Sequence, residues 1–276
     1  MQIARTLPDL RTAVADLRRA HGRIAMVPTM GALHAGHLAL LDAARAEGAA
    51  SIVASIFVNP LQFGAAEDLT RYPRTEASDL AALEAAGCAL VWGPPVDAMY
   101  PPGACTTIDV AGPAEGFEGA ARPGHFRGVA TVVAKLFMQT RADLALFGEK
   151  DWQQVQVVRR MATDLDLPIR VLAAATVREP DGLALSSRNR FLTEAERALA
   201  PGLYRVLTNV AEQLRAGRRG AIEEGIAALA VSGFVPDYLG LVEGETMRAL
   251  DAPTPGARLV VAARLGAVRL LDNVAV

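Results

Sequence analysis

The stretch Met26-Val27-Pro28-Thr29-Met30-Gly31-Ala32-Leu33-His34-Ala35-Gly36-His37 decides the fold of this chain. Ile24 to Val27 is an apolar run short enough for a buried strand, and apolar residues recur at helical spacing from Leu38 to Ala44. A proline and two glycines separate the runs, so we expect a strand, a tight turn and a helix start. Such a turn lets backbone approach a ligand, and the N–H groups and dipole of a helix start suit phosphate.

Two histidines, His34 and His37, stand at this helix start. A lone histidine there is most often a helix cap or a satisfied polar residue. A pair in a glycine-containing turn favours contact with a ligand instead, because both rings can donate hydrogen bonds and carry positive charge. We expect the pair to stabilise a leaving pyrophosphate.

Composition restricts the classes of protein that this chain can belong to. It has 276 residues, of which 51% are hydrophobic, which fits one large or two modest domains. The net charge is −2 and the charges are dispersed, so we expect neither a nucleic-acid partner nor a membrane surface. No uncharged apolar run is long enough for a membrane span. Cys88 and Cys105 lack metal-ligand spacing, and a reduced cytoplasmic setting is the simpler reading.

Strand and helix patterns alternate over the first two thirds of the chain. This alternation predicts an α/β fold with a Rossmann-like, doubly wound parallel sheet. We also expect a short strand at 107–110 and a long loop at 111–128. The opening turn, residues 59–63 and residues 148–151 each follow a strand directly and should converge on one cleft. The predicted strands are Ser51 to Val58, Cys88 to Trp92, Leu144 to Phe147 and Ile169 to Ala175.

The pattern changes near Val177, where we predict the start of a smaller C-terminal α+β domain. The capping box Thr193-x-x-Glu196 should open one long helix to about Leu214. A second helix and three strands follow, the last two joined around Gly266. We therefore divide the chain into residues 1–176 and 177–276.

Polar residues near the element boundaries suit phosphate chemistry. Lys150 and Arg188 could neutralise phosphate oxygens, and Ser186 and Ser187 could donate hydroxyl hydrogen bonds. Taken singly, Lys150 reads as a surface residue in a charge run and Arg188 as a cation beside a helix. Their positions in small or polar turns favour the functional reading.

Two neutral amides and two carboxylates complete the candidates. Gln62 and Gln154 each offer a donor and an acceptor, which could hold a hydroxy acid without adding charge, although a solvated glutamine is the default. Asp79 and Asp151 could bind Mg²⁺, and solvated carboxylates are an equal alternative.

Several motifs occur in an order that resembles the pantoate–β-alanine ligase (pantothenate synthetase) family, and the resemblance covers nearly the whole chain. His-x-Gly-His alone indicates only the wider nucleotidyltransferase superfamily, whereas the Asn-Pro-x-Gln-Phe and Ser-Ser-Arg-Asn segments are specific. The motifs are Pro28-Thr29-Met30-Gly31-x-Leu33-His34-x-Gly36-His37, Phe57-Val58-Asn59-Pro60-x-Gln62-Phe63, Tyr72-Pro73-Arg74, Arg122-Pro123-Gly124-His125-Phe126-Arg127-Gly128, Gly148-Glu149-Lys150-Asp151 and Asp181-Gly182-Leu183-Ala184-x-Ser186-Ser187-Arg188-Asn189.

The resemblance implies ATP-dependent ligation of pantoate and β-alanine through a pantoyl-adenylate, with release of AMP and pyrophosphate. It implies His37 as proton donor, pantoate and β-alanine at Gln62, pantoate at Gln154, and a lid role for residues 177–276. It also implies Mg²⁺ and a cytoplasmic homodimer. Leu185 stands where a methionine is common. The implied ATP-binding residues are Met30, Gly31, Ala32, Leu33, His34, Ala35, Gly36, His37, Gly148, Glu149, Lys150, Asp151, Val177, Leu185, Ser186, Ser187 and Arg188.

Two other classes of function stay open on the residues alone. A nucleotidyltransferase that places AMP on a phosphate would need more cationic groups for its second substrate than Gln62 and Gln154 provide. A non-catalytic nucleotide-binding module would not need two amides beside the phosphate residues, and it would release no pyrophosphate.

Overall fold

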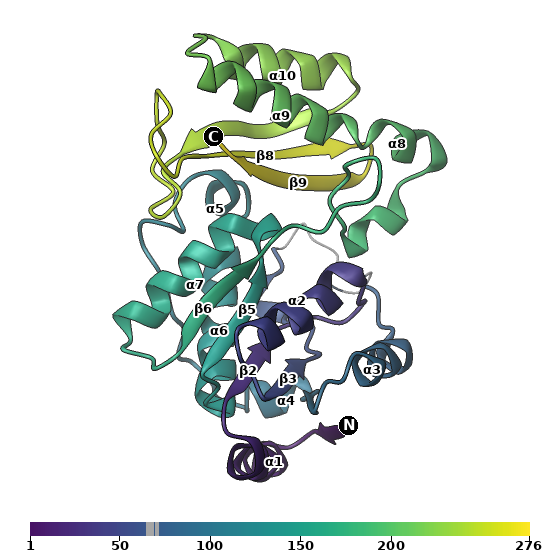
Figure 1. Cartoon of the computed structure of the whole chain (residues 1–276), viewed down its shortest axis with the longest axis vertical. Helices are drawn as coiled ribbons and strands as arrows, with labels where there is room; N and C mark the ends of the chain where they lie inside the picture. The colour runs from purple at the N-terminus through teal and green to yellow at the C-terminus, as the bar shows by residue number, and fades with distance from the viewer. Residues whose placement is uncertain (65–68, 70–71) are drawn as a thin grey trace. The chain divides into compact units, whose positions relative to one another are not determined.

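The computed structural model describes residues 1–64, 69 and 72–276, which divide into two compact units (Figure 1). The C-terminal part of the second unit begins at Ala175, close to the predicted division, and two earlier segments also belong to that unit. The use of the two parts as separate functional domains stays a prediction. The first unit comprises Met1–Val110, Arg122–Gly148 and Val157–Ala174, and the second comprises Ala111–Ala121, Glu149–Gln156 and Ala175–Val276.

A six-stranded parallel sheet forms the centre of the first unit in its described residues, in the order β1-β4-β3-β2-β5-β6. From β2 the chain moves outward to β3 and β4 on one side and later to β5 and β6 on the other. The carboxyl ends of β2 and β5 therefore flank the switch point where ligands bind in such sheets. The predicted doubly wound fold is confirmed. The strands are β1 Gln2–Ala4, β2 Ile24–Val27, β3 Ser51–Ser55, β4 Leu90–Trp92, β5 Leu144–Gly148 and β6 Arg170–Ala174.

Helices cover both faces of this sheet, which explains why the whole of β2 is buried (Figure 1). Leu41 of α2 and Leu83 of α3 pack against one face, beside Val27. On the other face the ring of Phe137 in α6 lies 6.5 Å from that of Phe147. The helices are α1 Leu7–His21, α2 Ala35–Ala46, η1 Pro60–Gln62, α3 Glu76–Ala85, α4 Val96–Met99, α6 His125–Thr140 and the later part of α7 Trp152–Asp164.

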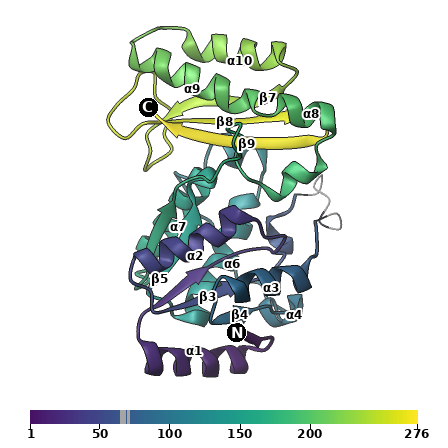
Figure 2. The ribbon, with the colours of Figure 1, turned by 45° about the vertical axis from the view of Figure 1, so that its right-hand side comes forward.

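The second unit is built on an antiparallel sheet in the order β7-β8-β9. Helices α9 and α10 lie on one face of the sheet (Figure 2), where Leu207 and Leu229 join an apolar core with Leu259 and Val268. The predicted smaller α+β fold is confirmed. Its elements are α5 Phe117–Ala121, η3 Glu149–Asp151, the start of α7, η4 Ser187–Phe191, α8 Glu194–Leu199, α9 Gly202–Arg215, α10 Ala221–Val231, β7 Val235–Val242, β8 Arg258–Leu265 and β9 Val268–Ala275.

Segments 111–121 and 149–156 join the second unit through polar bonds and ring packing. Trp152 Nε1 donates to the carbonyl of Gly244 at 2.6 Å. The buried carboxylate of Glu118 accepts from Arg269 at 2.8 Å and from Tyr238 Oη at 3.1 Å. Phe117 and Trp152 pack against a small apolar cluster on the sheet. Such long-range contacts cannot be read from hydrophobic periodicity.

Three sequence predictions differ from the structure. Residues 107–110 form no strand among the described residues, and Ile108 N donates to Thr131 Oγ1 at 2.9 Å instead. The predicted loop at 111–128 contains α5 and the first turn of α6. The helix predicted from Thr193 to Leu214 is two helices, because Pro201 lacks the N–H that a continuous helix needs at that point. The Thr193–Glu196 capping box itself is confirmed.

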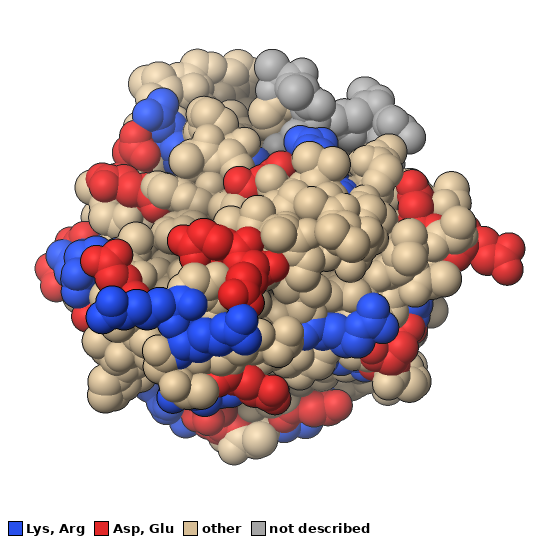
Figure 3. Space-filling model, turned by 90° about the horizontal axis from the view of Figure 1, so that it is seen from above, with Lys and Arg blue, Asp and Glu red and all other residues tan. Residues whose placement is uncertain are grey.

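Charges of both signs are interspersed on the face shown in Figure 3. In the part of the chain that the structure describes, no helix has the length and apolar character needed to cross a membrane.

Gly128 in α6 gives a test of the packing inside the first unit. A Cβ at this position would lie 2.6 Å from Gln62 N and closer still to the carbonyl of Leu61. Alanine normally stabilises a helix interior relative to glycine by up to about 1 kcal/mol. We expect Gly128→Ala instead to lower the free energy of unfolding by about 1–3 kcal/mol, measured by urea denaturation. Gly148→Ala is the control, because no atom lies within 4 Å of its added Cβ; a stabilising Gly128→Ala would contradict the packing.

Candidate active site

The turn between β2 and α2 uses its backbone amides within the protein. Gly31 N donates to Thr29 Oγ1 at 3.2 Å, and the amides of Ala32 and Leu33 donate to the two oxygens of Asp79, both at 2.9 Å. Gly31 and Ala32 have φ angles of +82° and +52°. Positive φ is strained for alanine, so the turn needs the bonds from Asp79 to hold it. Contact between these three amides and a phosphate stays a prediction that the observed bonds do not favour, because protein groups accept their hydrogen bonds.

His34 and His37 close the start of α2 as a reciprocal cap. His34 Nδ1 accepts from Gly36 N at 3.2 Å, and His37 Nδ1 accepts from His34 N at 3.3 Å. The ring centroids are 4.1 Å apart. Because Nδ1 is an acceptor in each ring, a neutral ring carries its proton on Nε2. The cap therefore fixes both histidines as Nε2–H donors, so capping and ligand binding are compatible roles.

Gln62 lies beside the same turn. Its Nε2 is 3.2 Å from Met30 Sδ, and its Oε1 accepts from Asn59 Nδ2 at 3.0 Å. The structure thus brings the opening turn and the segment after β3 together, as the strand order predicts.

Further polar groups hold Gln62 and its partner Asn59 through hydrogen bonds. Asn59 is 1% exposed, and its Oδ1 accepts from Tyr100 Oη at 2.8 Å. Burial raises the pKa of Tyr100 well above its ordinary value, so its hydroxyl stays a donor. The carbonyl of Gln62 lies 2.9 Å from His125 Nδ1 and accepts from Arg122 Nη2 at 3.3 Å. Gln62 is therefore held through its backbone and its side chain.

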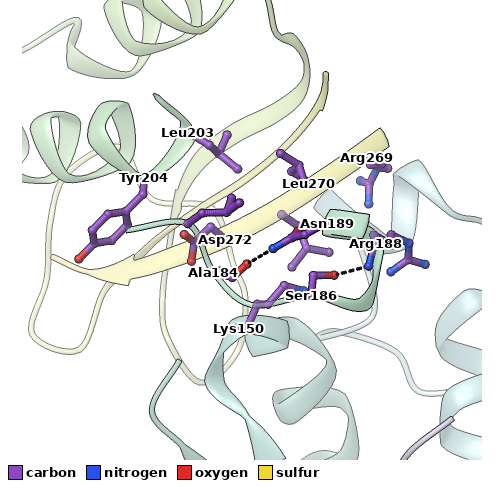
Figure 4. A pocket seen from close by; sticks show the side chains of 12 residues that line it. Lys150, Ala184, Ser186, Arg188, Asn189, Leu203, Tyr204, Arg269, Leu270 and Asp272 are labelled. Carbon is purple, nitrogen blue, oxygen red and sulfur yellow. Dashed lines mark hydrogen bonds between the residues drawn. The ribbon is translucent and has the colours of Figure 1, made fainter. Parts of the chain in front are cut away.

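The second unit contains a pocket along the free edge of β9 (Figure 4). It brings together three predicted phosphate residues, Lys150, Ser186 and Arg188. The Lys150 side chain is 16% exposed, and its Nζ lies 3.5 Å from Asp151 Oδ1. The pocket is lined by Lys150, Leu183, Ala184, Ser186, Arg188, Asn189, Leu203, Tyr204, Arg269, Leu270, Leu271 and Asp272.

The loop that carries Ser186 and Arg188 has a defined local structure. Ser186 Oγ caps η4 by accepting from Arg188 N at 3.2 Å, and Asn189 Nδ2 donates to the carbonyl of Ala184 at 3.0 Å (Figure 4). Leu185 N donates to the carbonyl of Val177 at 3.0 Å. Two separated predicted ATP residues, Val177 and Leu185, are therefore neighbours.

The remaining predicted residues have simpler placements. Gly148 ends β5 in the first unit, and Ala35 is the first residue of α2. Ser187 begins η4, and Glu149 pairs with Arg258 at 3.0 Å. Gln154 lies in the first turn of α7, in the second unit, while Gln62 belongs to the first.

The described residues do not form a protein-built magnesium site. Both oxygens of Asp79 accept hydrogen bonds, Asp79 is 4% exposed, and no three His, Cys, Asp or Glu side chains gather as a ligand group in the described chain. Mg²⁺ usually keeps several waters and uses one or two carboxylates together with substrate phosphates. Asp79 as a metal ligand stays a prediction that its observed bonds do not favour.

Sequence reasoning missed the residues that hold the site residues in place. The sequence offered Asp79 as a metal ligand or as a solvated carboxylate, although it follows the helix start at Thr75 by one turn. Asp272 follows Val268 and Leu270 at the spacing of one strand face, which is the signal that could have marked it as a buried polar group. Tyr100 had no signal in the sequence.

The fold and the histidine turn together indicate a class of protein. A doubly wound parallel sheet with a His-x-Gly-His helix start beside its switch point is typical of a nucleotide-binding protein of the nucleotidyltransferase class. The chain belongs to the pantoate–β-alanine ligase family, whose model matches residues 2–275. The family that the sequence motifs resemble is therefore confirmed.

Named relatives and solved structures agree with this assignment. The chain is 58% identical to a pantothenate synthetase of Acidiphilium cryptum, over 100% of both chains. The pantothenate synthetase structure from Thermus thermophilus has a TM-score of 0.92 at 49% identity, covering 100% of this chain and 99% of that one. A pantoate–β-alanine ligase from Francisella tularensis, complexed with β-γ ATP and β-alanine, has a TM-score of 0.85 at 31% identity, covering 100% and 97%.

Asp79→Asn separates a positioning role from a metal-binding role. The amide replaces one oxygen by an N–H donor, which faces a backbone N–H donor of the turn. We expect the free energy of unfolding to fall by about 1–3 kcal/mol and ligase activity to fall with it. The Mg²⁺ concentration that gives half the maximal rate should not change. Asp97→Asn, at an exposed residue of α4, is the control; a large rise in the required Mg²⁺ would instead make Asp79 a ligand.

Proposed function

We propose that the chain ligates pantoate and β-alanine in two steps, with ATP as the activating substrate and a pantoyl-adenylate between them. Membership of the pantoate–β-alanine ligase family over residues 2–275 is the observation that carries this function. The capped histidine pair and the pocket with Lys150 and Arg188 support the assignment of the individual residues.

In the first step a carboxylate oxygen of pantoate attacks the α-phosphorus of ATP. The new phosphorus–oxygen bond forms as the bond to the β-phosphate oxygen breaks, and pyrophosphate leaves. The pantoate carboxylate is already ionised at neutral pH, so this attack needs no general base. The protein has to position two anions and stabilise the charge that develops on the leaving group.

We assign the charge stabilisation to side chains of both units. In the first unit, the Nε2–H groups of His34 and His37 donate to the leaving pyrophosphate, and His37 is the proton donor. In the second unit, Lys150 and Arg188 neutralise phosphate oxygens, while Ser186 and Ser187 donate hydroxyl hydrogen bonds. The ATP residues that the family resemblance implies complete the assignment.

In the second step the neutral amine of β-alanine attacks the carbonyl carbon of the adenylate. The amide bond forms, AMP leaves with the electron pair of the broken carbon–oxygen bond, and the nitrogen loses a proton. We assign pantoate to Gln62 and Gln154, and β-alanine to Gln62. The Gln62 amide accepts from Asn59 and donates to Met30, and these two bonds support the role because they fix the orientation of the amide.

Mg²⁺, a homodimer and a cytoplasmic setting are further parts of the proposal, and all three rest on the family resemblance. The described residues contain no ready-made metal site, so we propose that Mg²⁺ arrives with the phosphates of ATP. The lid role of residues 177–276 also stays a proposal.

Replacement of His37 tests the leaving-group role. We expect His37→Ala to lower the rate of pyrophosphate release by about two to three orders of magnitude, the effect of losing one transition-state donor. Pyrophosphate release with saturating ATP and pantoate is the measurement. His21→Ala, at the exposed end of α1, should keep the unmodified rate. If His37→Ala released pyrophosphate as fast as His21→Ala, His37 would have no part in the mechanism.

Isotope exchange between pyrophosphate and ATP tests the proposed order of steps. A carboxylate is a poor acyl donor, so activation by adenylation has to precede amide formation. We expect pantoate alone to support exchange, with β-alanine absent and with no exchange when pantoate is omitted. A strict requirement for β-alanine would replace the free adenylate by a concerted route.

A further inference from the structure

The short turn η3, which carries Lys150, is held by a side chain from the last strand of the chain. Asn273 Nδ2 donates to the carbonyl of Glu149 at 2.8 Å and to the carbonyl of Lys150 at 3.0 Å. Asn273 is 5% exposed, so both bonds lie away from solvent. One amide therefore satisfies two consecutive carbonyls of the turn.

The orientation of the Asn273 amide is itself determined. Its Oδ1 accepts from Arg258 Nη1 at 2.5 Å, so Nδ2 must point toward the turn. The Arg258 guanidinium is stacked 3.6 Å from the ring centroid of Trp152 and donates from Nη2 to Glu149 Oε1 at 3.0 Å. Arg258 thus bonds directly to Glu149 in the turn, and it also fixes the orientation of the Asn273 amide.

These bonds fix the backbone from which the Lys150 side chain extends into the pocket with Ser186 and Arg188. A lysine side chain is a flexible stem with a point charge, so its anchoring backbone decides where the ammonium group can lie. We propose that Asn273 is a positioning residue for Lys150. Through Asn273, strand β9 fixes where the phosphate-binding ammonium group of Lys150 can lie. This inference rests on the proposed role of Lys150 in ATP binding.

A misplacement of about 1 Å at a charge-stabilising group can cost about 100-fold in rate. We expect Asn273→Ala to lower the rate of pantoate-dependent pyrophosphate–ATP exchange by about 10- to 100-fold and to raise the KM for ATP. The KM for pantoate should change by less than about two-fold. Asn273→Ser, which keeps one donor, should lose less, and it keeps the test available if the alanine variant does not fold.

A double-mutant cycle distinguishes positioning from general stability. In a Lys150→Ala background, Asn273→Ala should lower the exchange rate by no more than about two-fold, because the group that it positions is gone. An equal loss in both backgrounds would overturn the inference. No loss of exchange in Lys150→Ala alone would overturn the proposed function of Lys150 instead, so the two failures are distinguishable.

Arg215→Ala is the control, because Arg215 Nη2 makes another side chain–backbone bond to β9, to the carbonyl of Ala275 at 2.7 Å, and among the described residues it has no bond to Glu149 or Lys150. Its exchange rate and both KM values should stay unchanged. A kinetic loss in Arg215→Ala as large as that in Asn273→Ala would also overturn the inference, since it would make the effect one of strand stability.

Discussion

The hydrogen bonds from the amides of Ala32 and Leu33 to the carboxylate of Asp79 are the constraint on which the histidine site depends. The turn that leaves β2 passes through two residues of positive φ, and only the first is glycine. Without an acceptor for these amides, the buried N–H groups and the strained alanine would both destabilise the turn. An ionised carboxylate is the strongest acceptor available, and it sits one turn inside α3.

The side chains proposed to act on the substrates are held in place by hydrogen bonds to neighbouring groups of the protein. The histidine rings are aligned by each other and by the amides of the helix start. Gln62 is aligned by Asn59, and Asn59 by Tyr100. Catalysis at phosphorus needs little covalent chemistry from a protein, and so the precision of these supports is most of what the protein contributes.

The sequence predicted the architecture well, because the architecture depends on local patterns. The apolar run at Ile24–Val27, the glycine turn and the Thr193–Glu196 capping box each involve only residues that are close together in the sequence. The family motifs then located Lys150, Ser186 and Arg188, which share one pocket. The composition of residues 107–110 favours a strand, but a strand needs a pairing partner that composition does not supply.

The supporting residues could not be predicted, since each acts across a long stretch of chain. Asp79 lies far in sequence from the turn that it holds, and Asn273 lies farther still from Lys150. An isolated aspartate or asparagine carries no mark of its partner. The break at Pro201 has a different cause, because the helical periodicity continues past the proline while the backbone cannot.

The second unit is assembled from three separate stretches of chain, and this affects how the protein can be cut or recombined. A fragment beginning at Ala175 would lack Phe117 and Trp152, and it would expose the apolar faces of Val242, Met247 and Val260 to water. It would also leave Arg269 without the carboxylate of Glu118. Such a fragment should aggregate rather than fold, and a chimaera that exchanges the C-terminal part with a relative needs matching sequences at 111–121 and 149–156 to remain compact.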